Sequence, residues 1–361
     1  MGKLQKVLIM AGGTGGHVFP GLAVAKLLRE QGVTVDWLGT QNGLEARIVP
    51  EAGIPIHYIS ISGVRGKGFL NKALAPFRLF WAVMQSLRII RQLKPDVVLG
   101  MGGFASGPGG IASWLLRYPL VIHEQNAKAG LTNKWLARFA KKVLEGFPGT
   151  FPANGKAVAT GNPVRIEIAK LPSPQSRRLD RIDQPLHLLV LGGSLGAAAI
   201  NDLVPQALAE LSLSERPKVY HQTGAKHLDD TLKAYASAKV DAEVVPFITD
   251  MDKAYAWADI VLCRAGALTI AELCAAGLGA ILVPYPHAAD DHQTANANYL
   301  VKNHAALLIQ QTALTVDGLA KLLRELAASP IQRDAMAQAA YQLRRIDATD
   351  KVFKICGEIC R

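Results

Sequence analysis

A histidine directly after a glycine-rich turn is the first residue of this chain placed to do acid–base chemistry. His17 follows Thr14, Gly15 and Gly16 in AGGTGGH, between an apolar run and a helical-looking segment. The positive end of a helix dipole disfavours the imidazolium, and a general base must be neutral at pH 7. Glu124, in the stretch HEQN, competes for the same role.

Three glycine-rich turns could hold an anion. They occupy residues 12–16, 100–110 and 192–197, and each follows an apolar run and precedes a helical pattern. Glycine has no Cβ to keep a ligand away from the backbone, and a turn before a helix points unsatisfied N–H groups at an anion. Tight strand–helix packing explains one such turn equally well. Three turns in two matching halves favour ligand binding.

Polar side chains further along the chain could bind a ligand or have ordinary structural roles. Ser194 lies in the third turn, where it could cap a helix, bind phosphate or do both. Arg165 follows GNPV and, on the residues alone, is an ordinary surface arginine. Thr269 and Glu272 have the T-x-x-E spacing of a capping box, which is the interpretation that the residues alone favour.

Two uncharged amides, Asn126 and Gln293, could hydrogen-bond sugar hydroxyls. Gln293 directly follows Asp290, Asp291 and His292, which are all possible metal ligands but crowd one short loop. Helix ends and a fixed arginine can neutralise a leaving diphosphate without a metal. We therefore expect no metal and no cofactor.

A dinucleotide is the first alternative ligand for the opening turn. Asp36 lies about twenty residues beyond the turn, close to the spacing of the dinucleotide fingerprint. However, Asp36 precedes WLG and so falls inside a strand, and neither turn has the G-x-G-x-x-G pattern. A nicotinamide-dependent oxidoreductase is therefore the weaker hypothesis.

The elements that must position these residues alternate between strands and helices. Strands are predicted at 33–39 and 54–61 and a long helix at about 70–93, and segment 131–143 also has a helical pattern. Apolar strands that do not alternate with polar residues indicate a parallel sheet covered on both faces. After a Pro-, Ser- and charge-rich segment, the opening pattern recurs at 186–208. We therefore expect an α/β protein with two parallel sheets facing an interdomain cleft.

Composition narrows the function classes. The 361 residues carry a formal charge of +11, which suggests an anionic lipid, nucleic acid or phosphorylated partner. No Lys/Arg block with interleaved aromatics occurs, so we expect no nucleic acid. Four cysteines without a C-x-x-C pair favour free thiols in a reducing cytosol. No signal peptide and no apolar run of about 18 residues is evident.

Several motifs, in order from near residue 7 to beyond residue 300, resemble those of the MurG family. They read AGGTGGHVFPGLAVA, SGVRGKG, LGMGGFASGPGG, HEQNAKAGLTNKWLA, GNPVR, LGGSLGA and CRAGALTIAELCAAG followed by ADDHQTANA. The resemblance implies the GT-B glycosyltransferase fold, with two Rossmann-like domains. Residues 1–161 would form the acceptor- and membrane-facing domain and 162–342 the UDP-GlcNAc-binding domain, with a last helix at about 343–361 packing back on the first.

The resemblance also implies a reaction. It is metal-independent, inverting transfer of GlcNAc from UDP-GlcNAc to the C4 hydroxyl of lipid I (undecaprenyl-pyrophosphoryl-MurNAc-pentapeptide), giving lipid II and UDP in peptidoglycan biosynthesis. A UDP-GlcNAc 2-epimerase, another GT-B UDP-sugar transferase and a non-catalytic UDP-GlcNAc sensor remain alternatives.

The family's residues carry over to positions of this sequence. The resemblance reverses the capping-box interpretation of Glu272, because the matching glutamate of the family binds the ribose hydroxyls of UDP. It also implies that the backbone of Ile248 contacts the edge of the uracil ring. The implied catalytic residues are His17 and Glu124. The implied UDP-GlcNAc-binding residues are Thr14, Gly15, Gly16, Asn126, Arg165, Ser194, Ile248, Ala267, Leu268, Thr269, Ile270, Ala271, Glu272 and Gln293.

A polyprenyl-linked acceptor requires the enzyme to reach the membrane surface. Segment 69–90 is apolar nearly all round, with basic residues among its aromatics. We expect a peripheral protein at the cytoplasmic face of the bacterial inner membrane, touching anionic lipid, and the family implies further partners in the cell-wall and division machinery. The expected membrane patch is Leu74, Phe77, Phe80, Trp81 and Trp114.

Overall fold

The computed structural model describes residues 3–61, 74–153, 155–178, 184–193 and 196–360. The chain divides into two compact units. Unit 1 comprises Met1–Val164 and Ile346–Arg361, and unit 2 comprises Arg165–Arg345.

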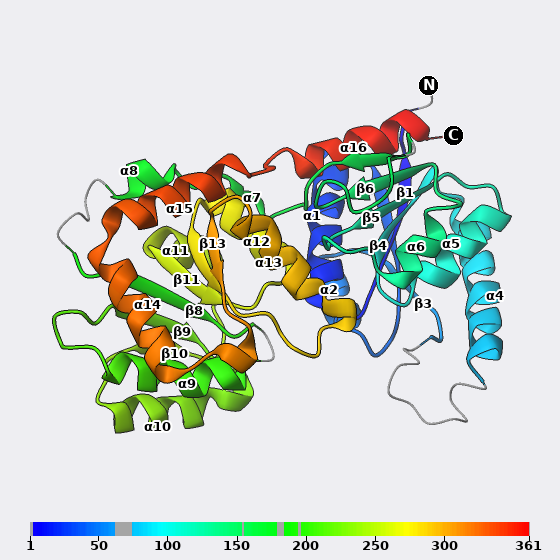
Figure 1. Ribbon diagram of the computed structural model, residues 1–361. Helices are drawn as coiled ribbons and strands as arrows, with labels where there is room; N and C mark the ends of the chain where they lie inside the picture. The colour runs from blue at the N-terminus through cyan, green and yellow to red at the C-terminus, as the bar shows by residue number, and fades with distance from the viewer. Residues whose placement is uncertain (1–2, 62–73, 154, 179–183, 194–195, 361) are drawn as a thin grey trace. The chain divides into compact units, whose positions relative to one another are not determined.

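Unit 1 is built on a seven-stranded parallel sheet with the order β3-β2-β1-β4-β5-β6-β7 (Figure 1). The first strand, KVLIMA, is buried along almost its whole length, as the absence of alternation predicts. The strands are β1 (Lys6–Ala11), β2 (Thr34–Gly39), β3 (Ile56–Tyr58), β4 (Val97–Gly102), β5 (Leu120–Glu124), β6 (Lys142–Glu145) and β7 (Ala157–Ala159).

Helices cover both faces of this sheet. They are α1 (Gly15–Glu30), α2 (Glu45–Glu51), α4 (Ala75–Leu93), α5 (Ser106–Leu115), α6 (Leu131–Leu136) and α16 (Ala348–Ile359). The last of these, α16, lies against α1 (Figure 1). Its Val352 and Cys356 are fully buried in the same apolar cluster as Val7 and Val24, so the end of the chain completes the core of unit 1.

Unit 2 repeats the arrangement with a six-stranded parallel sheet of order β10-β9-β8-β11-β12-β13. Its strands are β8 (His187–Leu191), β9 (Lys218–Gln222), β10 (Glu243–Val245), β11 (Ile260–Cys263), β12 (Gly279–Leu282) and β13 (Ala306–Leu308). Counted from the first strand of each unit, the first six strands of both sheets have the order 3-2-1-4-5-6, which is the doubly wound order, and unit 1 adds a seventh strand at the edge. The expected pair of parallel α/β sheets is confirmed.

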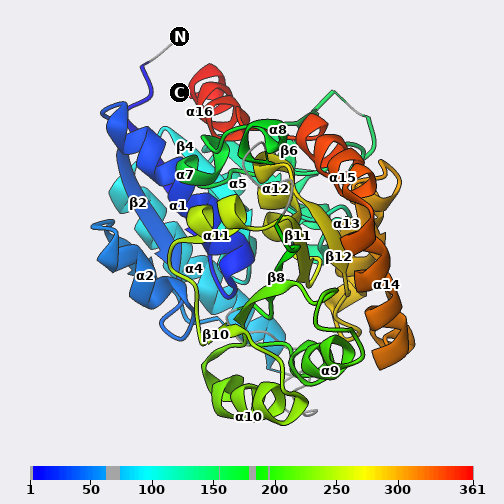
Figure 2. The same ribbon diagram turned by 90° about the vertical axis from the view of Figure 1, so that its left-hand side faces the viewer.

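The helices of unit 2 include α9 and α10, which lie side by side (Figure 2), with α14 next to α9. The helices are α7 (Ile166–Ala169), α8 (Pro174–Arg178), α9 (Ala198–Ala209), α10 (Leu228–Ala238), α11 (Met251–Trp257), α12 (Ala267–Ala276), α13 (His292–Val301), α14 (Val316–Ala328) and α15 (Pro330–Gln342). Three short 3-10 turns are η1 (Ala225–His227), η2 (Ala289–Asp291) and η3 (Gln311–Ala313).

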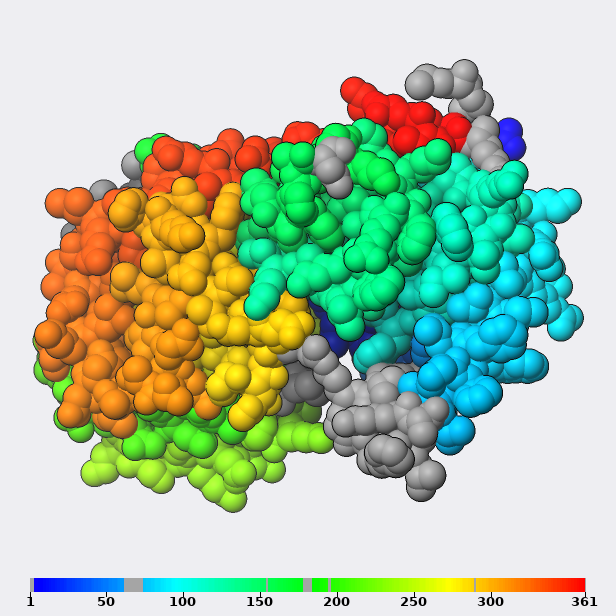
Figure 3. Space-filling view, turned by 45° about the vertical axis from the view of Figure 1, so that its right-hand side comes forward, coloured from blue at the N-terminus to red at the C-terminus, as the bar shows by residue number. Residues whose placement is uncertain are grey.

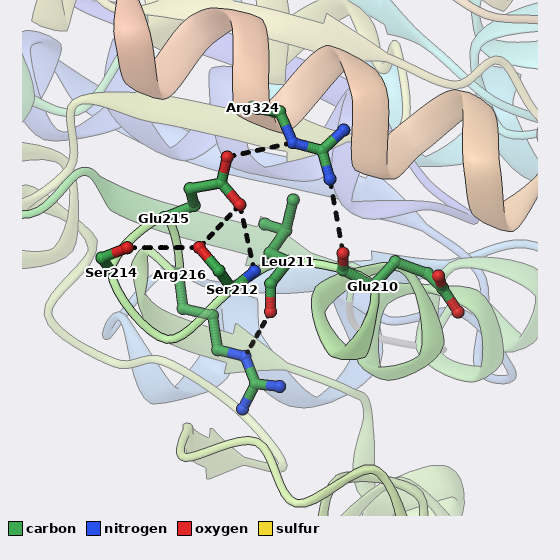
Figure 4. Close-up of polar contacts among 7 residues, drawn as sticks. All are labelled: Glu210, Leu211, Ser212, Ser214, Glu215, Arg216 and Arg324. Atoms are coloured by element: carbon green, nitrogen blue, oxygen red, sulfur yellow. Dashed lines mark hydrogen bonds and ion pairs between the residues drawn. The ribbon is translucent and has the colours of Figure 1, made fainter.

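A surface network fixes the connection between α9 and β9 (Figure 4). Glu215 Oε2 accepts the backbone N–H and the hydroxyl of Ser212 at 3.0 and 2.8 Å, while its Oε1 accepts Nε of Arg324 at 3.1 Å. Arg324 also donates to the carbonyl of Glu210 at 3.3 Å, which joins α14 to the end of α9. These hydrogen bonds lower the pKa of Glu215, mainly through Ser212.

The structure corrects several element boundaries. The helical pattern expected at 131–143 is α6 only to Leu136, and β6 begins at Lys142. Of the helix expected from about residue 70, the structure describes α4 from Ala75, and residues 62–73 lie outside the described part. Pro76 occupies the first turn of α4, where its missing N–H has no partner to lose. Within the described residues, no helix has the length and apolarity needed to cross a membrane.

Candidate active site

The first glycine turn leads into α1 without a side-chain cap. Thr14 is the N-cap residue with extended backbone angles (φ −109°, ψ 158°), yet its hydroxyl accepts no hydrogen bond from the first turn. By contrast, Thr315 Oγ1 caps α14 by accepting the N–H of Gly318 at 3.2 Å. The start of α1, at Gly15 and Gly16, therefore lacks the side-chain oxygen that commonly satisfies helix donors.

A buried carboxylate that the sequence analysis did not single out accepts hydrogen bonds from the same turn. Glu45 is fully buried; its Oε2 accepts the N–H of Gly13 at 2.9 Å, and its Oε1 accepts the N–H and hydroxyl of Thr40 at 2.9 and 2.7 Å. A Cβ on Gly12 would lie 2.5 Å from Glu45 Oε1. The Gly13 N–H is therefore occupied by the protein itself, which leaves the helix start as the open part of the turn.

The turns that follow β1 and β4 are in contact. A Cβ on Gly103 (φ +82°) would collide with the carbonyl of Gly12, and one on Gly102 (φ +98°) would lie 2.7 Å from Nδ1 of His17. The buried Ser106 hydroxyl ties the two strands together by hydrogen bonds to Met10 O and Gly102 O, at 2.9 and 2.8 Å. Open parallel sheets bind ligands at this point, where the strand order reverses.

His17 is the third residue of α1 and is partly exposed. Its Nδ1 lies 3.0 Å from Oε1 of Gln125, at the end of β5. Its Nε2 has no hydrogen-bond partner within the described residues. The structure thus brings His17 to the HEQN segment, with one ring nitrogen engaged and the other available.

Glu124 is a buried carboxylate with four donors around it. Its Oε1 accepts the N–H and the side-chain Nδ2 of Asn126 at 3.0 and 3.1 Å, and its Oε2 accepts the N–H of Gly130 and Nδ2 of Asn133 at 3.0 and 2.9 Å. Four donors fill the lone-pair positions of a carboxylate. Glu124 therefore fixes the loop between β5 and α6, and holds Asn126 in it.

In unit 2, two side chains from different elements donate three hydrogen bonds to one carboxylate. Glu272 Oε1 accepts Nε and Nη2 of Arg165 at 3.1 and 2.8 Å, and its Oε2 accepts the hydroxyl of Tyr255 at 3.1 Å. Burial, and then the nearby Glu272, raise the pKa of Tyr255 well above its usual value, so its hydroxyl stays protonated and donates. Sequence reasoning missed Tyr255, which lies on α11.

The capping-box interpretation of Thr269 and Glu272 is wrong. The N-cap of α12 is Gly266, so Thr269 is already the third helical residue and Glu272 lies a turn further on. The side chains of Ala267 and Ile270 are buried, and the N–H of Ile270 already donates to the carbonyl of Gly266 at 2.9 Å. Leu268, Thr269 and Ala271, also predicted site residues, are partly exposed on the same helix start.

Two further predicted residues already make contacts within unit 2. Gln293 Oε1 accepts the N–H of Ala265 and of Tyr285, at 3.2 and 2.9 Å, which joins the loops that follow β11 and β12. The N–H of Ile248 donates to Gln222 Oε1 at 3.1 Å, and the Ile248 side chain is buried, so its carbonyl is the remaining polar group. The predicted Ser194 lies outside the described residues.

The segment before Gln293 has an irregular backbone. Asp290 and Asp291 both have left-handed conformations, with φ of 52° and 55°. Among the described residues, no group of three or more His, Cys, Asp and Glu side chains is arranged to hold a metal ion.

An apolar surface extends over α4, α5 and α6 of unit 1. The predicted patch residues Leu74, Phe77, Phe80, Trp81 and Trp114 are 47–74% exposed, and Figure 3 shows α4, in light blue, at the surface. The helices α5 and α6 and the turn before α5 add large apolar side chains that the predicted patch did not include: Phe104, Leu115, Leu131 and Trp135. We call these nine residues the α4–α6 surface. Exposed large apolar side chains on neighbouring elements are candidates for a contact with a membrane or another protein.

Comparison with known proteins identifies the class. The N-terminal domain model of glycosyltransferase family 28 matches residues 7–145, and the C-terminal domain model of that family matches residues 187–352. The fold and these matches define a two-domain family 28 glycosyltransferase. More narrowly, the chain belongs to the MurG family.

That membership rests on relatives that match over nearly the whole chain. The chain is 55% identical to a protein of Nitrosococcus oceani and 53% identical to one of Marinobacter nauticus, each over 98% of this chain and at least 97% of the relative. Both are named UDP-N-acetylglucosamine–N-acetylmuramyl-(pentapeptide) pyrophosphoryl-undecaprenol N-acetylglucosamine transferase. The crystal structure of Acinetobacter baumannii MurG is 44% identical, with a TM-score of 0.85, covering 98% of this chain and 99% of that one.

More distant structures share the fold alone. A UDP-GlcNAc 2-epimerase from Neisseria meningitidis, solved with UDP-GlcNAc, is 12% identical with a TM-score of 0.64, covering 97% of this chain and 99% of that one. The fold therefore does not separate transferase from epimerase; the high identity to the named transferases does.

Proposed function

We propose that this protein transfers GlcNAc from UDP-GlcNAc to the C4 hydroxyl of lipid I, giving lipid II and UDP in peptidoglycan biosynthesis. The observation that carries the proposal is the identity of 53–55% over 98% of the chain to transferases named for this donor and acceptor. The chemistry is one in-line displacement: the C4 oxygen forms a bond to the anomeric carbon as the bond from that carbon to the UDP oxygen breaks. One proton leaves the C4 hydroxyl, so one base suffices.

We assign that proton to Nε2 of His17. This nitrogen has no partner among the described residues and belongs to a partly exposed ring, whereas the oxygens of Glu124 already accept four hydrogen bonds. We therefore propose that the acceptor substrate binds to residues 1–161, together with about 343–361. Its binding site would include Thr14, Gly15, Gly16 and His17 at the start of α1. Asn126, held by Glu124, is proposed to contact the donor sugar.

We assign the donor to the region of 162–342. The N–H groups of Ala267, Leu268 and Thr269 at the start of α12 would face the diphosphate. Ile270 and Ala271 follow them on the same helix, and Ser194 is proposed to bind the diphosphate as well. The free carbonyl of Ile248 would accept from the uracil edge. Gln293 has its oxygen engaged by two backbone N–H groups, so its Nε2 would donate to a GlcNAc hydroxyl.

Binding of the ribose would exchange partners at Glu272. Three of its four lone-pair positions are taken by Arg165 and Tyr255, so two vicinal hydroxyls require Arg165 to leave. The released guanidinium is then free to face the diphosphate, where a fixed positive charge stabilises UDP as it departs.

The α4–α6 surface is proposed to hold the enzyme on the cytoplasmic face of the bacterial inner membrane. Its exposed aromatics can enter the interface, and neighbouring cations can attract anionic headgroups: Arg78 lies in α4, and the Arg138 guanidinium lies 4.7 Å above the Trp135 ring. Proteins of the cell-wall and division machinery are proposed as partners on the same membrane.

The test is transfer of labelled GlcNAc from UDP-GlcNAc to a lipid I analogue in the presence of EDTA, with His17→Asn as the comparison. Labelled disaccharide-linked lipid and free UDP are expected from the wild type. Binding of UDP-GlcNAc without transfer, or its conversion to a 2-epimer without acceptor, would overturn the proposal.

A further inference from the structure

A chain of buried hydrogen bonds runs behind His17. Nε2 of His123 lies 3.0 Å from the carbonyl oxygen of Gly161, Nε2 of Gln125 lies 3.1 Å from Nδ1 of His123, and Oε1 of Gln125 lies 3.0 Å from Nδ1 of His17. His123 is fully buried and Gln125 nearly so, and Asn162 anchors the backbone carbonyl of Gln125 at 2.9 Å. The links connect the end of β5 to α1 within unit 1.

Each link in this chain has one possible direction. The Gly161 carbonyl can only accept, so His123 must carry its proton on Nε2. Burial lowers the pKa of His123 to about 4, so at neutral pH its ring is uncharged and Nδ1 is an acceptor. Gln125 must therefore turn its amide NH2 toward His123. The same NH2 lies 3.3 Å from the carbonyl of His123, which also can only accept.

The amide orientation decides the tautomer of His17. With its NH2 facing His123, Gln125 presents Oε1 to His17, and a carbonyl oxygen requires the proton on Nδ1. We propose that Gln125 and His123 are positioning residues that hold neutral His17 in the Nδ1–H tautomer, so that Nε2 carries the lone pair. The base role of Nε2 rests on the proposed function, whereas the tautomer follows from the hydrogen bonds alone.

The backbone of β4 reinforces this arrangement. Gly102 lies against the Nδ1 and Cε1 edge of the ring, because a Cβ there would be 2.7 and 2.9 Å from those atoms. That edge faces protein, and Nε2 is the nitrogen a substrate hydroxyl can reach. A neutral histidine side chain in water prefers the proton on Nε2, which would leave no lone pair there; the buried chain reverses that preference.

The experiment is ¹⁵N NMR of histidine-labelled full-length protein, which separates protonated from unprotonated ring nitrogens. The His17 signals are assigned by their loss in His17→Asn. We expect Nδ1 protonated and Nε2 unprotonated in the wild type. Gln125→Leu should return His17 to the Nε2–H form, whereas Gln125→Glu, which keeps an acceptor oxygen there, should retain Nδ1–H. Ser113→Ala, which removes a buried hydrogen bond to Gly109 elsewhere in unit 1, should leave the signals unchanged.

Activity is measured on the same variants. Gln125→Leu should lower kcat by about tenfold or more with KM for UDP-GlcNAc unchanged, because the base loses its lone pair and donor binding does not. A wild-type His17 protonated on Nε2, or a Gln125→Leu variant that keeps Nδ1–H, would overturn the inference. A tautomer change without loss of kcat would support the positioning chain and refute only the base role of His17.

Discussion

Arg165 and Glu272 stand 107 positions apart in the sequence, yet Nε and Nη2 of Arg165 both donate to the same oxygen, Oε1 of Glu272. Tyr255 occupies the other oxygen, so three donors converge on a carboxylate whose side chain is only 12% exposed. A ligand that needs this carboxylate must therefore compete with a guanidinium that is already bound.

Replacing Glu272 with Gln should weaken donor binding. The variant loses a charged acceptor for the ribose hydroxyls, and hydrogen bonds to a charged group contribute about 1.5–3 kcal/mol each, so KM for UDP-GlcNAc should rise roughly 10- to 100-fold. Initial rates at saturating lipid I analogue measure the change. The matched control is Glu215→Gln, which alters a second Arg–Glu pair of unit 2, with Arg324 (Figure 4). An equal rise in KM in both variants would contradict a ribose contact.

Replacing Glu124 with Gln should destabilise unit 1 rather than remove a base. An amide NH2 would face donors at a buried site, and a buried group left unsatisfied costs about 1–3 kcal/mol. Urea unfolding measures the loss of stability, and kcat is determined at a temperature well below the thermal unfolding transition of the variant. Wild-type stability with kcat reduced a thousandfold would instead identify Glu124 as the base.

Gly102→Ala should disturb His17 specifically. Its φ of +98° is unfavourable for alanine, and the new Cβ would press on Nδ1 of His17. We expect about 1–3 kcal/mol lower stability and a lower kcat. Gly32→Ala is the control, since it has φ +76° with no atom within 4 Å of the new Cβ. The Gly32→Ala variant should lose stability through the same backbone strain, but its kcat should equal that of the wild type.

The free energy of unfolding should fall as the pH drops from about 6.5 toward 4. Burial lowers the pKa of His123 to about 4 and that of His221 to about 3, from 6.5. Between these pH values the unfolded chain therefore binds more protons than the folded protein. Each histidine lowers the free energy of unfolding by up to about 1.4 kcal/mol per pH unit as the pH falls. Urea unfolding at pH 7.5, 6.0 and 5.0 tests this. A stability that stays constant down to pH 5 would show that both rings accept protons without unfolding.

Replacing Phe77 and Trp81 together with Ser should reduce binding to anionic vesicles but not stability. Both side chains are exposed on α4, and each apolar side chain of this size contributes about 1.5–3 kcal/mol when fully buried. We expect at least a tenfold weaker partition in vesicle sedimentation, with an unchanged Tm. Ile331→Ser, at an 83% exposed position of unit 2, is the control. Equal losses in both variants would argue against the α4–α6 surface as the contact.

Much of the architecture could be predicted because buried parallel strands and glycine turns leave local signals. The runs beginning at Val7 and Leu186 and the turns after them indicate two similar halves without any knowledge of tertiary structure. The strands β6, β7 and β13 were missed. β6 begins at Lys142, inside the segment 131–143 that has a helical pattern, and β7 and β13 have only three residues each.

The partners within each site could not be read from local spacing. Glu45 holds Gly13 from 32 positions away, and Gln125 reaches His17 across 108. The T-x-x-E spacing predicted a capping box that the structure does not form. The N-cap of α12 is Gly266, and the side chain of Glu272 accepts hydrogen bonds from an arginine 107 positions away. The segment HEQN, however, contains the proposed positioning residues His123 and Gln125. Four polar residues in a row at the end of a buried strand indicate a functional segment.

The packing of α16 against α1 has a consequence for synthesis on the ribosome. The first strand of unit 1 emerges early, but the side chains of Val352 and Cys356 that cover its helix layer are translated after all of unit 2. Unit 2 can therefore close its core while unit 1 still exposes an apolar groove along α1. The nascent chain should need a chaperone at that groove until termination, and a stop codon placed directly after Arg345 should yield an insoluble product with a folded second unit.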